Sequence, residues 1–244
     1  MHSHYNALLV CLSYAVSVLG SFTALQLALS IPLANHPRKR LGAVLAAGTA
    51  MGGGAIWTMH FIAMLACNMG VQVSYDVWLT AVSALLAIVA CSLGLAMVSA
   101  ARVRFVHLLG AGVLMGLGVA GMHYIGMMAM LTSARASYDL PMVALSVAIA
   151  IVASMVALWL AFNLRGWLQM LGSSLVMGVA VCGMHFVGMA ALMLMPGDSL
   201  PVGFEQGVRG DRLGLMTFAV VIALLALALG MSIARQQRRA AVTI

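Results

Sequence analysis

Seven apolar segments, separated by short polar or basic stretches, restrict the fold of this chain more than any other feature. A helix needs about 20 mainly apolar residues to cross the hydrocarbon core of a bilayer. The segments reach that length and span residues 6–32, 42–68, 77–100, 106–132, 141–162, 168–195 and 213–234. Backbone groups in lipid must be satisfied within the membrane, and a helix does this by itself. The sequence therefore predicts an all-α, polytopic membrane protein with seven transmembrane helices.

The composition supports a membrane protein and excludes other classes. Of the 244 residues, 64% are hydrophobic and only 7% are charged, whereas a soluble domain carries roughly a quarter charged residues. The net charge of +7 comes from basic residues between apolar segments, so it indicates topology and not a nucleic-acid partner. The first apolar segment follows no basic region, and we interpret it as a retained helix. The four cysteines form no CxxC pair, which predicts buried thiols without a disulfide framework.

The basic residues also predict the orientation in the membrane. Nine of the twelve Lys and Arg residues fall on one side of the predicted helices: Arg38, Lys39, Arg40, Arg102, Arg104, Arg165, Arg235, Arg238 and Arg239. All five acidic residues fall on the other side, with Arg135, Arg209 and Arg212. Because cytoplasmic loops carry the excess of Lys and Arg, the basic side is predicted to be cytoplasmic. The N-terminus is then outside and the C-terminus is cytoplasmic.

A three-fold internal repeat organises residues 1–234, which we interpret as one domain followed by a cytoplasmic tail at 235–244. A Met-His-aromatic motif occurs three times, with its histidines at His60, His123 and His185. The spacings are 123 − 60 = 63 and 185 − 123 = 62 residues. The repetition predicts three helical hairpins, at about 6–76, 77–139 and 140–198, followed by a single C-terminal helix.

An aspartate follows each motif and precedes the next predicted helix. "SYD" occurs at 74–76 and 137–139, while the third copy keeps only Asp198. Asp is a preferred N-cap residue, and we favour this role over a ligand role for all three. His2 and His4 precede the first helix and are expected to lie in a loose outer tail, where they could also capture a metal ion before it enters the membrane.

The three motif histidines are the candidate metal ligands. Each lies about 7 to 10 residues before the end of its helix, which places all three at a common depth of about 10 to 15 Å. A Met four residues later shares the face of each His, giving Met64, Met127 and Met189. Possible additional ligands are Cys67, Cys182 and the methionines that precede the histidines, Met59, Met122 and Met184. Gly53, Gly116 and Gly178 stand seven residues before each His and would let neighbouring helices approach closely.

Imidazole, thioether and thiol groups form a soft ligand set that favours copper, especially Cu(I). Haem is the alternative, because His and Met are also axial ligands of haem iron. A structural explanation stays open, in which the histidines are interhelical hydrogen-bond partners and the methionines fill space. The chain carries no Ser-His-Asp arrangement, phosphate loop or pair of carboxylates within a predicted helix, so we do not expect an enzyme.

The triple motif resembles the MHYT domain, a sensor domain of bacterial cytoplasmic (inner) membranes. Met122-His123-Tyr124 carries three of the four naming letters, and the other copies read Met59-His60-Phe61 and Met184-His185-Phe186. The resemblance covers about residues 6–234. It implies copper bound near the outer face and sensing of oxygen, CO, NO or redox state. It also implies a cytoplasmic output partner, either a cyclic-di-GMP domain (GGDEF or EAL) or a histidine kinase, in cis or in trans.

The sequence thus predicts a copper-binding membrane sensor that uses His60, His123 and His185 with Met64, Met127 and Met189. The alternatives are a haem- or copper-dependent membrane redox protein and a copper carrier or transporter. A homodimer is compatible with the sequence, and the bilayer is the one certain partner of so apolar a chain.

Overall fold

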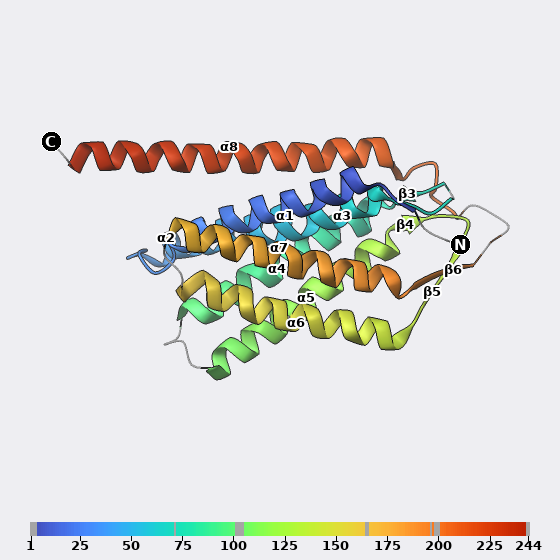
Figure 1. The fold of residues 1–244 in the computed structure, drawn as a ribbon, viewed down its shortest axis with the longest axis horizontal. Helices are drawn as coiled ribbons and strands as arrows, with labels where there is room; N and C mark the ends of the chain where they lie inside the picture. Colours follow the sequence, from blue (N-terminus) through green and yellow to red (C-terminus); the bar gives the residue numbers. More distant parts are fainter. Residues whose placement is uncertain are drawn as a thin grey trace.

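Seven helical passes lie roughly side by side in the computed structural model, which describes residues 4–70, 72–100, 105–163, 166–195, 197 and 201–242 (Figure 1). The passes are α1 (Ala7–Ala28), a composite of α2 (Pro37–Thr49), η1 (Ala50–Trp57) and α3 (Thr58–Ala66), α4 (Val77–Ala100), α5 (Phe105–Met128), α6 (Leu140–Asn163), α7 (Trp167–Ala190) and α8 (Gly210–Val242). Six of the passes are long and apolar enough to cross a membrane, and α8 contains a shorter apolar stretch, Arg212–Leu224. The prediction of a seven-helix membrane protein is confirmed.

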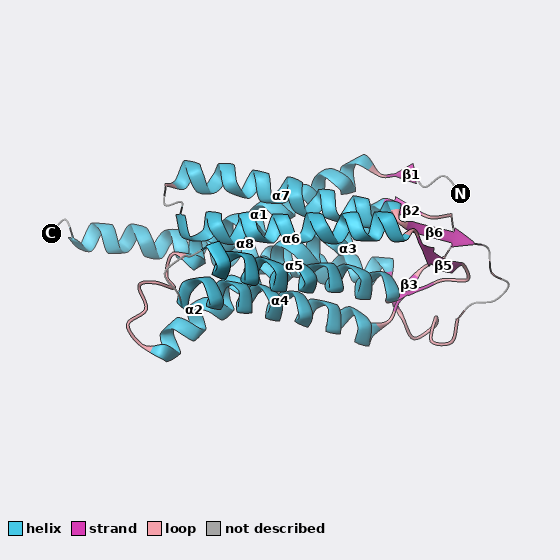
Figure 2. Ribbon diagram, turned by 90° about the horizontal axis from the view of Figure 1, so that it is seen from below, coloured by secondary structure: helices cyan, strands magenta, loops and turns pink. Residues whose placement is uncertain are grey.

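Short strands gather at one end of the helix bundle, which we call the strand end (Figure 2). They are β1 (His4–Tyr5), β2 (Cys67–Asn68), β3 (Ser74–Tyr75), β4 (Met130–Leu131), β5 (Arg135–Tyr138), β6 (Leu192–Met195) and β7 (Val208–Arg209). They pair antiparallel as β1–β2, β4–β3–β7 and β5–β6. The chain begins at the strand end, while α8 extends beyond the bundle at the opposite end (Figure 1).

Most predicted helices agree with the observed ones, whereas the short strands were not predicted. The three motif helices end at Ala66, Met128 and Ala190, which is two, four and five residues before their predicted ends, because the following residues pair as strands. The second pass begins at Pro37 and not at residue 42, since Pro occupies the first turn and the His36 ring accepts from the Arg38 backbone N–H. Residues 235–242, predicted as a tail, continue α8.

Three hairpins make up the first six passes, and one backbone contact recurs in each. Asn6, Asp76 and Asp139 precede α1, α4 and α6, and their N–H groups donate to the carbonyls of Ala66, Ala129 and Ala191 at 2.9, 2.8 and 2.9 Å. Each acceptor lies six residues after a motif His. These contacts tie the start of the first helix of each hairpin to the end of its motif helix. The hairpins are therefore α1 with α2–η1–α3, α4 with α5, and α6 with α7.

The aspartates cap helices, as predicted. The side chain of Asp76 accepts from the Leu79 backbone N–H at 2.8 Å, and Asp139 accepts from Met142 at 3.1 Å. Asp198 lies outside the described residues. The side chain of Asn6 caps α1 as the two aspartates cap α4 and α6, accepting from the backbone N–H groups of Leu8 and Leu9. The N-terminal "HYN" at 4–6 is thus the counterpart of the two "SYD" segments. The backbone of His4 pairs with Asn68, so the expectation of a loose tail at His4 is wrong, while His2 lies outside the described residues.

Charges separate between the two ends as the sequence predicts. Arg38, Lys39 and Arg40 begin α2 at the opposite end, where the Arg40 guanidinium donates to Ser99 at the end of α4. Asp76, Asp139 and Glu205 lie in the segments at the strand end, and Asp211 follows the first residue of α8 there. Arg102, Arg104 and Arg165 lie outside the described residues.

Glycines bring helix backbones into direct contact near the motif helices. A Cβ on Gly116 would lie 2.5 Å from the Cα of Ile151 in α6, and one on Gly20 would lie 2.5 Å from the backbone nitrogen of Ala55 in η1. The predicted close approach therefore holds for Gly116. A Cβ on Gly178 would meet side chains of α1, whereas one on Gly53 would have ordinary contacts only.

Candidate metal site

The three motif helices bring their histidines together at one buried point. His60 lies on α3, His123 on α5 and His185 on α7, and their side chains are 1%, 0% and 0% exposed. The Nδ1 atom of His60 lies 3.0 Å from Nδ1 of His185 and 3.2 Å from Nδ1 of His123. One ligand nitrogen from each ring can be chosen so that all three lie within 4.8 Å of one another. We call this group the histidine triad.

The three rings meet edge to face in a nearly three-fold arrangement. Their centroids are 4.9 to 5.2 Å apart, and the ring planes are 79° to 86° from parallel. Each ring also meets the aromatic residue that follows it at 4.8 to 5.1 Å, namely Phe61, Tyr124 and Phe186. Such contacts restrict ring rotation, so the orientation of the imidazoles is set by their surroundings.

A second aromatic layer repeats the same three-fold pattern. Phe61 meets Tyr75, Tyr124 meets Tyr138, and Phe186 meets Tyr5, with centroids 5.6 to 5.8 Å apart. Tyr75 and Tyr138 come from the "SYD" segments, and the N-terminal Tyr5 takes the third place. This role of Tyr5 was not predicted from the sequence, although "HYN" resembles "SYD" and also precedes a helix.

Glycines pack against the Nε2 atoms of two of the three rings, which was not predicted from the sequence. A Cβ on Gly126 would lie 2.5 Å from Nε2 of His60, and one on Gly188 would lie 2.3 Å from Nε2 of His123. Gly126 and Gly188 each stand three residues after a motif His, where the first copy has Ala63. No hydrogen-bond partner is found for the three Nε2 atoms among the described residues. The Nδ1 atoms, which face one another, are therefore the nitrogens that a shared ligand would meet.

The spacing of the Nδ1 atoms fits a metal ion. With metal–nitrogen bonds of about 2.0 to 2.1 Å, two nitrogens of a tetrahedral or trigonal site lie roughly 3.3 to 3.6 Å apart. The observed 3.0 and 3.2 Å are slightly shorter, so a small outward movement of the rings would complete such a site. Neutral imidazole is a common ligand for copper and for other first-row metals. The residues thus fit a metal without identifying it.

The methionines four residues after each His are buried beside the triad. Met64, Met127 and Met189 are 1%, 2% and 6% exposed, and they lie one helical turn nearer the strand end. Met59, Met122 and Met184 are equally buried. Met184 also lines a narrow cavity of about 20 Å³ toward the opposite end, together with Met51, Met115 and Met177. Ligation by any methionine stays a prediction.

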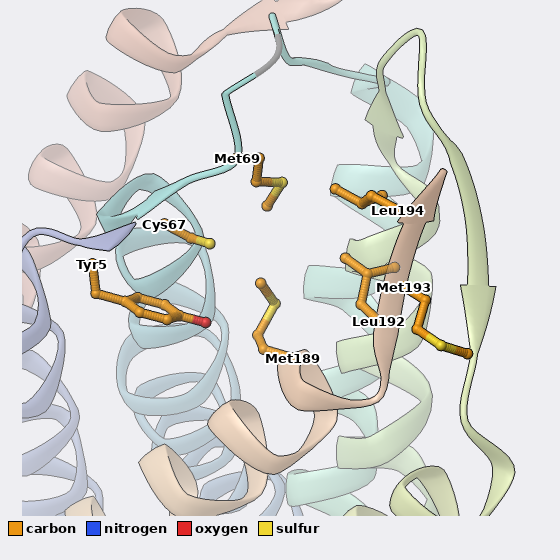
Figure 3. Close-up of a pocket in the computed structure, with 7 residues that line it drawn as sticks. All are labelled: Tyr5, Cys67, Met69, Met189, Leu192, Met193 and Leu194. Carbon is orange, nitrogen blue, oxygen red and sulfur yellow. The ribbon is translucent and has the colours of Figure 1, made fainter. Parts of the chain in front are cut away.

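The two cysteines of the predicted ligand set are not part of the close group that the three histidines form within the described part of the chain. Cys182 lies on α7 and is partly exposed. Cys67 ends α3 and begins β2. Its side chain lines a separate cavity toward the strand end, with Met189 (Figure 3).

Comparison with known proteins identifies the family. The repeat described as "bacterial signalling protein N terminal repeat", MHYT, matches residues 53–111, 116–173 and 178–244. The chain belongs to the MHYT family. The family repeat starts at Gly53, Gly116 and Gly178, seven residues before each triad histidine, so its period agrees with that of the motif.

Curated relatives of this MHYT chain are signalling proteins. It is 38% identical over 236 residues to the bifunctional diguanylate cyclase/cyclic di-GMP phosphodiesterase MucR of Pseudomonas aeruginosa, covering 95% of this chain and 34% of the relative. It is 34% identical to the cyclic di-GMP phosphodiesterase NbdA of the same species, covering 96% and 30%. It is 31% identical to the signaling protein YkoW of Bacillus subtilis, covering 86% and 26%. The chain therefore spans about a third or less of these relatives. No solved structure matches it.

Proposed function

We propose that this MHYT domain is a copper-binding sensor of a bacterial cytoplasmic membrane that responds to a diatomic gas or to redox state. The observation that carries the proposal is the triad itself, in which three buried imidazoles meet and the Nδ1 atom of His60 lies within 3.2 Å of the Nδ1 atoms of both His123 and His185. Polar groups buried in a membrane protein are costly and usually serve a function. A bound metal would give all three Nδ1 atoms a partner at once.

Copper is favoured over haem by the spacing of the triad. Two axial ligands of haem lie on opposite faces of a flat macrocycle, whereas the Nδ1 atoms of His60 and His185 are only 3.0 Å apart. A macrocycle would have to separate imidazole rings whose centroids are only 4.9 to 5.2 Å apart. A single ion needs only a small movement of the rings. Met64, Met127 and Met189 would add soft thioether ligands from the strand-end side, which suits Cu(I).

When bound, copper would supply a redox-active centre with affinity for oxygen, CO or NO. The side chains of the protein would orient and isolate it. His60, His123 and His185 would hold the ion, the aromatic layer would fix the rings, and burial would exclude water. We do not assign a catalytic role to this domain.

The direction of signalling follows from the charges and from α8. The strand end would face outward and the basic end would face the cytoplasm, because Arg38, Lys39 and Arg40 lie at the latter. Leu224 of α8 packs on Gly54 of η1, which is continuous with the helix that carries His60. A change at the triad would move η1, and α8 would carry the change to the cytoplasmic side. There a cyclic-di-GMP or kinase output domain, in cis or in trans, would respond, as the names of MucR and NbdA suggest.

The proposal is tested by metal analysis and absorption spectroscopy of the purified chain after anaerobic loading with Cu(I) and a chelator wash. We expect retained copper and no Soret band. His123→Ala removes one ligand and should reduce copper retention by roughly tenfold or more. His107→Ala is the matched control, since this exposed His stands at the start of the same helix. Equal retention by the two variants, or a Soret band in place of copper, would refute the proposal.

A further inference from the structure

A cavity at the strand end brings three sulfur atoms together outside the histidine triad. It has a volume of about 250 Å³ and is lined by Tyr5, Cys67, Met69, Met189, Leu192, Met193 and Leu194. Figure 3 shows the side chains of Cys67, Met69 and Met189 directed into the same space from three different segments. We call this space the sulfur chamber.

Pairing of the strand-end segments builds the chamber. Cys67 begins β2 and pairs with Tyr5 of β1, so the N-terminal segment forms one wall. Met69 follows in the loop above, and Met189 rises from the last turn of α7. The polar group of Tyr5 also points inward (Figure 3). Because the segments belong to the first and third hairpins, the chamber forms only when the hairpins are assembled.

The chemistry of the lining selects a soft, monovalent metal ion. One thiol and two thioethers are ligands that favour Cu(I), and among the residues that the structure describes no carboxylate lines the cavity. Met69 and Met189 are 8% and 6% exposed, whereas Tyr5 at the rim is 41% exposed. The thioethers are therefore buried, while the chamber is accessible to solvent on the side of Tyr5. By contrast, Met193 lines the same cavity but turns away from its centre (Figure 3).

The position of the chamber connects the surface with the triad. Met189 stands four residues after His185, about 6 Å farther along α7 toward the strand end. The triad itself is inaccessible, with histidines no more than 1% exposed. An ion that reaches it from the strand end by way of the chamber would meet Met189, which lines the chamber one helical turn from His185. Thioethers and a thiol bind Cu(I) without changing its oxidation state.

We propose that Cys67, Met69 and Met189 form a Cu(I) entry site, which accepts the ion at the strand end and passes it to the histidine triad. On binding, the Cys67 thiol releases its proton to water at the open rim. On transfer, the Cu–S bonds are exchanged for Cu–N bonds at the triad, and Cys67 takes up a proton again. Copper remains Cu(I) throughout. This inference rests on the proposed function for its second step, the transfer, but not for the first.

The test follows anaerobic transfer of copper from the Cu(I)–bathocuproine disulfonate complex to the full chain. Cys67→Ser and Met69→Leu should slow the loading of the triad by about tenfold or more, because a ligand of the entry site is lost. The final copper content of the triad should be unchanged. Met193→Leu is the matched control and should load at the wild-type rate. Loading of Cys67→Ser and Met69→Leu at the wild-type rate would overturn the entry site and leave the triad as the copper site.

A second measurement separates this inference from the proposed function. In His123→Ala, the triad is incomplete while the chamber is intact, so X-ray absorption of the copper-loaded protein before any chelator wash should show sulfur neighbours. These should disappear when Cys67→Ser is added. If copper in the wild-type protein were bound by sulfur and none by the triad histidines, this result would support the entry site and contradict the proposed function. Absence of sulfur neighbours in His123→Ala, in a protein that remains folded by circular dichroism, would contradict the entry site.

Discussion

The first motif helix and the other two carry the same Met-His-aromatic motif in different surroundings. Residues 50–64, from the start of η1 to Met64 in α3, are all buried, whereas α5 and α7 alternate buried and exposed positions. The difference arises because α8 covers the first copy, packing against α1, η1 and α3 (Figure 1). The triad is thus nearly three-fold, while the scaffold around it is not.

A π-helix marks the same asymmetry. The segment Ala50–Trp57 is a π-helix, while the equivalent parts of α5 and α7 are α-helical. Thr58 closes this segment, with both its backbone N–H and its hydroxyl donating to the Gly53 carbonyl. π-helical segments are rare, and those that interrupt α-helices are frequently found at functional sites. In the proposed function, the three-fold part would position the metal ion, and the first motif helix would connect it to α8.

The largest effect is expected at the glycines that the first copy lacks. A methyl group at Gly188 would lie 2.3 Å from Nε2 of His123, so Gly188→Ala must displace this ring and disturb Nδ1. We expect copper retention to fall by roughly tenfold or more. Overpacking should also lower the free energy of unfolding by about 1 to 3 kcal/mol. Copper analysis and thermal unfolding in detergent measure the two effects.

Gly183→Ala is the control for this change. Gly183 lies on the same helix as Gly188, and a Cβ on Gly183 would meet nothing within 4 Å. Alanine is the better helix former by up to about 1 kcal/mol, so this variant should retain copper and be at least as stable as the wild type. Full copper retention by Gly188→Ala would show that the Gly-to-His contact does not position the ring.

The sequence predicted the triad because its signal is local and repeated. Three histidines at equal spacing in helices of the same direction must lie at one depth, whatever the packing. The contacts of Gly126 and Gly188 join different helices, so their meaning depends on how the helices are rotated, which the sequence pattern leaves open. Cys67 shows the same limit: helical geometry directs it toward His60, but the helix ends at Ala66 and Cys67 belongs to a strand. The contacts of α8 also depend on packing, because its sequence predicts only an apolar helix and not which helices it covers.

A smaller effect is expected where η1 meets α4. A Cβ on Gly52 would lie 2.4 Å from the backbone carbonyl oxygen of Ala87, which cannot move without shifting α4. Gly52→Ala should lower the free energy of unfolding by about 1 to 3 kcal/mol. A Cβ on the neighbouring Gly53 would have its nearest contact at 3.4 Å, with the end of the Ile88 side chain. Gly53→Ala should therefore leave the melting temperature almost unchanged, and similar melting of the two variants would argue against this contact.

The smallest effect is expected at the helix caps, where the three hairpins are most alike. Asp139→Ala removes the acceptor for the Met142 N–H and should cost about 1 kcal/mol. Its backbone N–H still donates to the Ala191 carbonyl, so the hairpin and the triad stay in place and copper retention should not change. Asp139→Asn is the control, because Asn6 caps α1 in the same way and an amide oxygen can replace the carboxylate. If Asp139→Ala lost copper while Asp139→Asn kept it, the cap would have to position the motif helix of its hairpin in addition to starting α6.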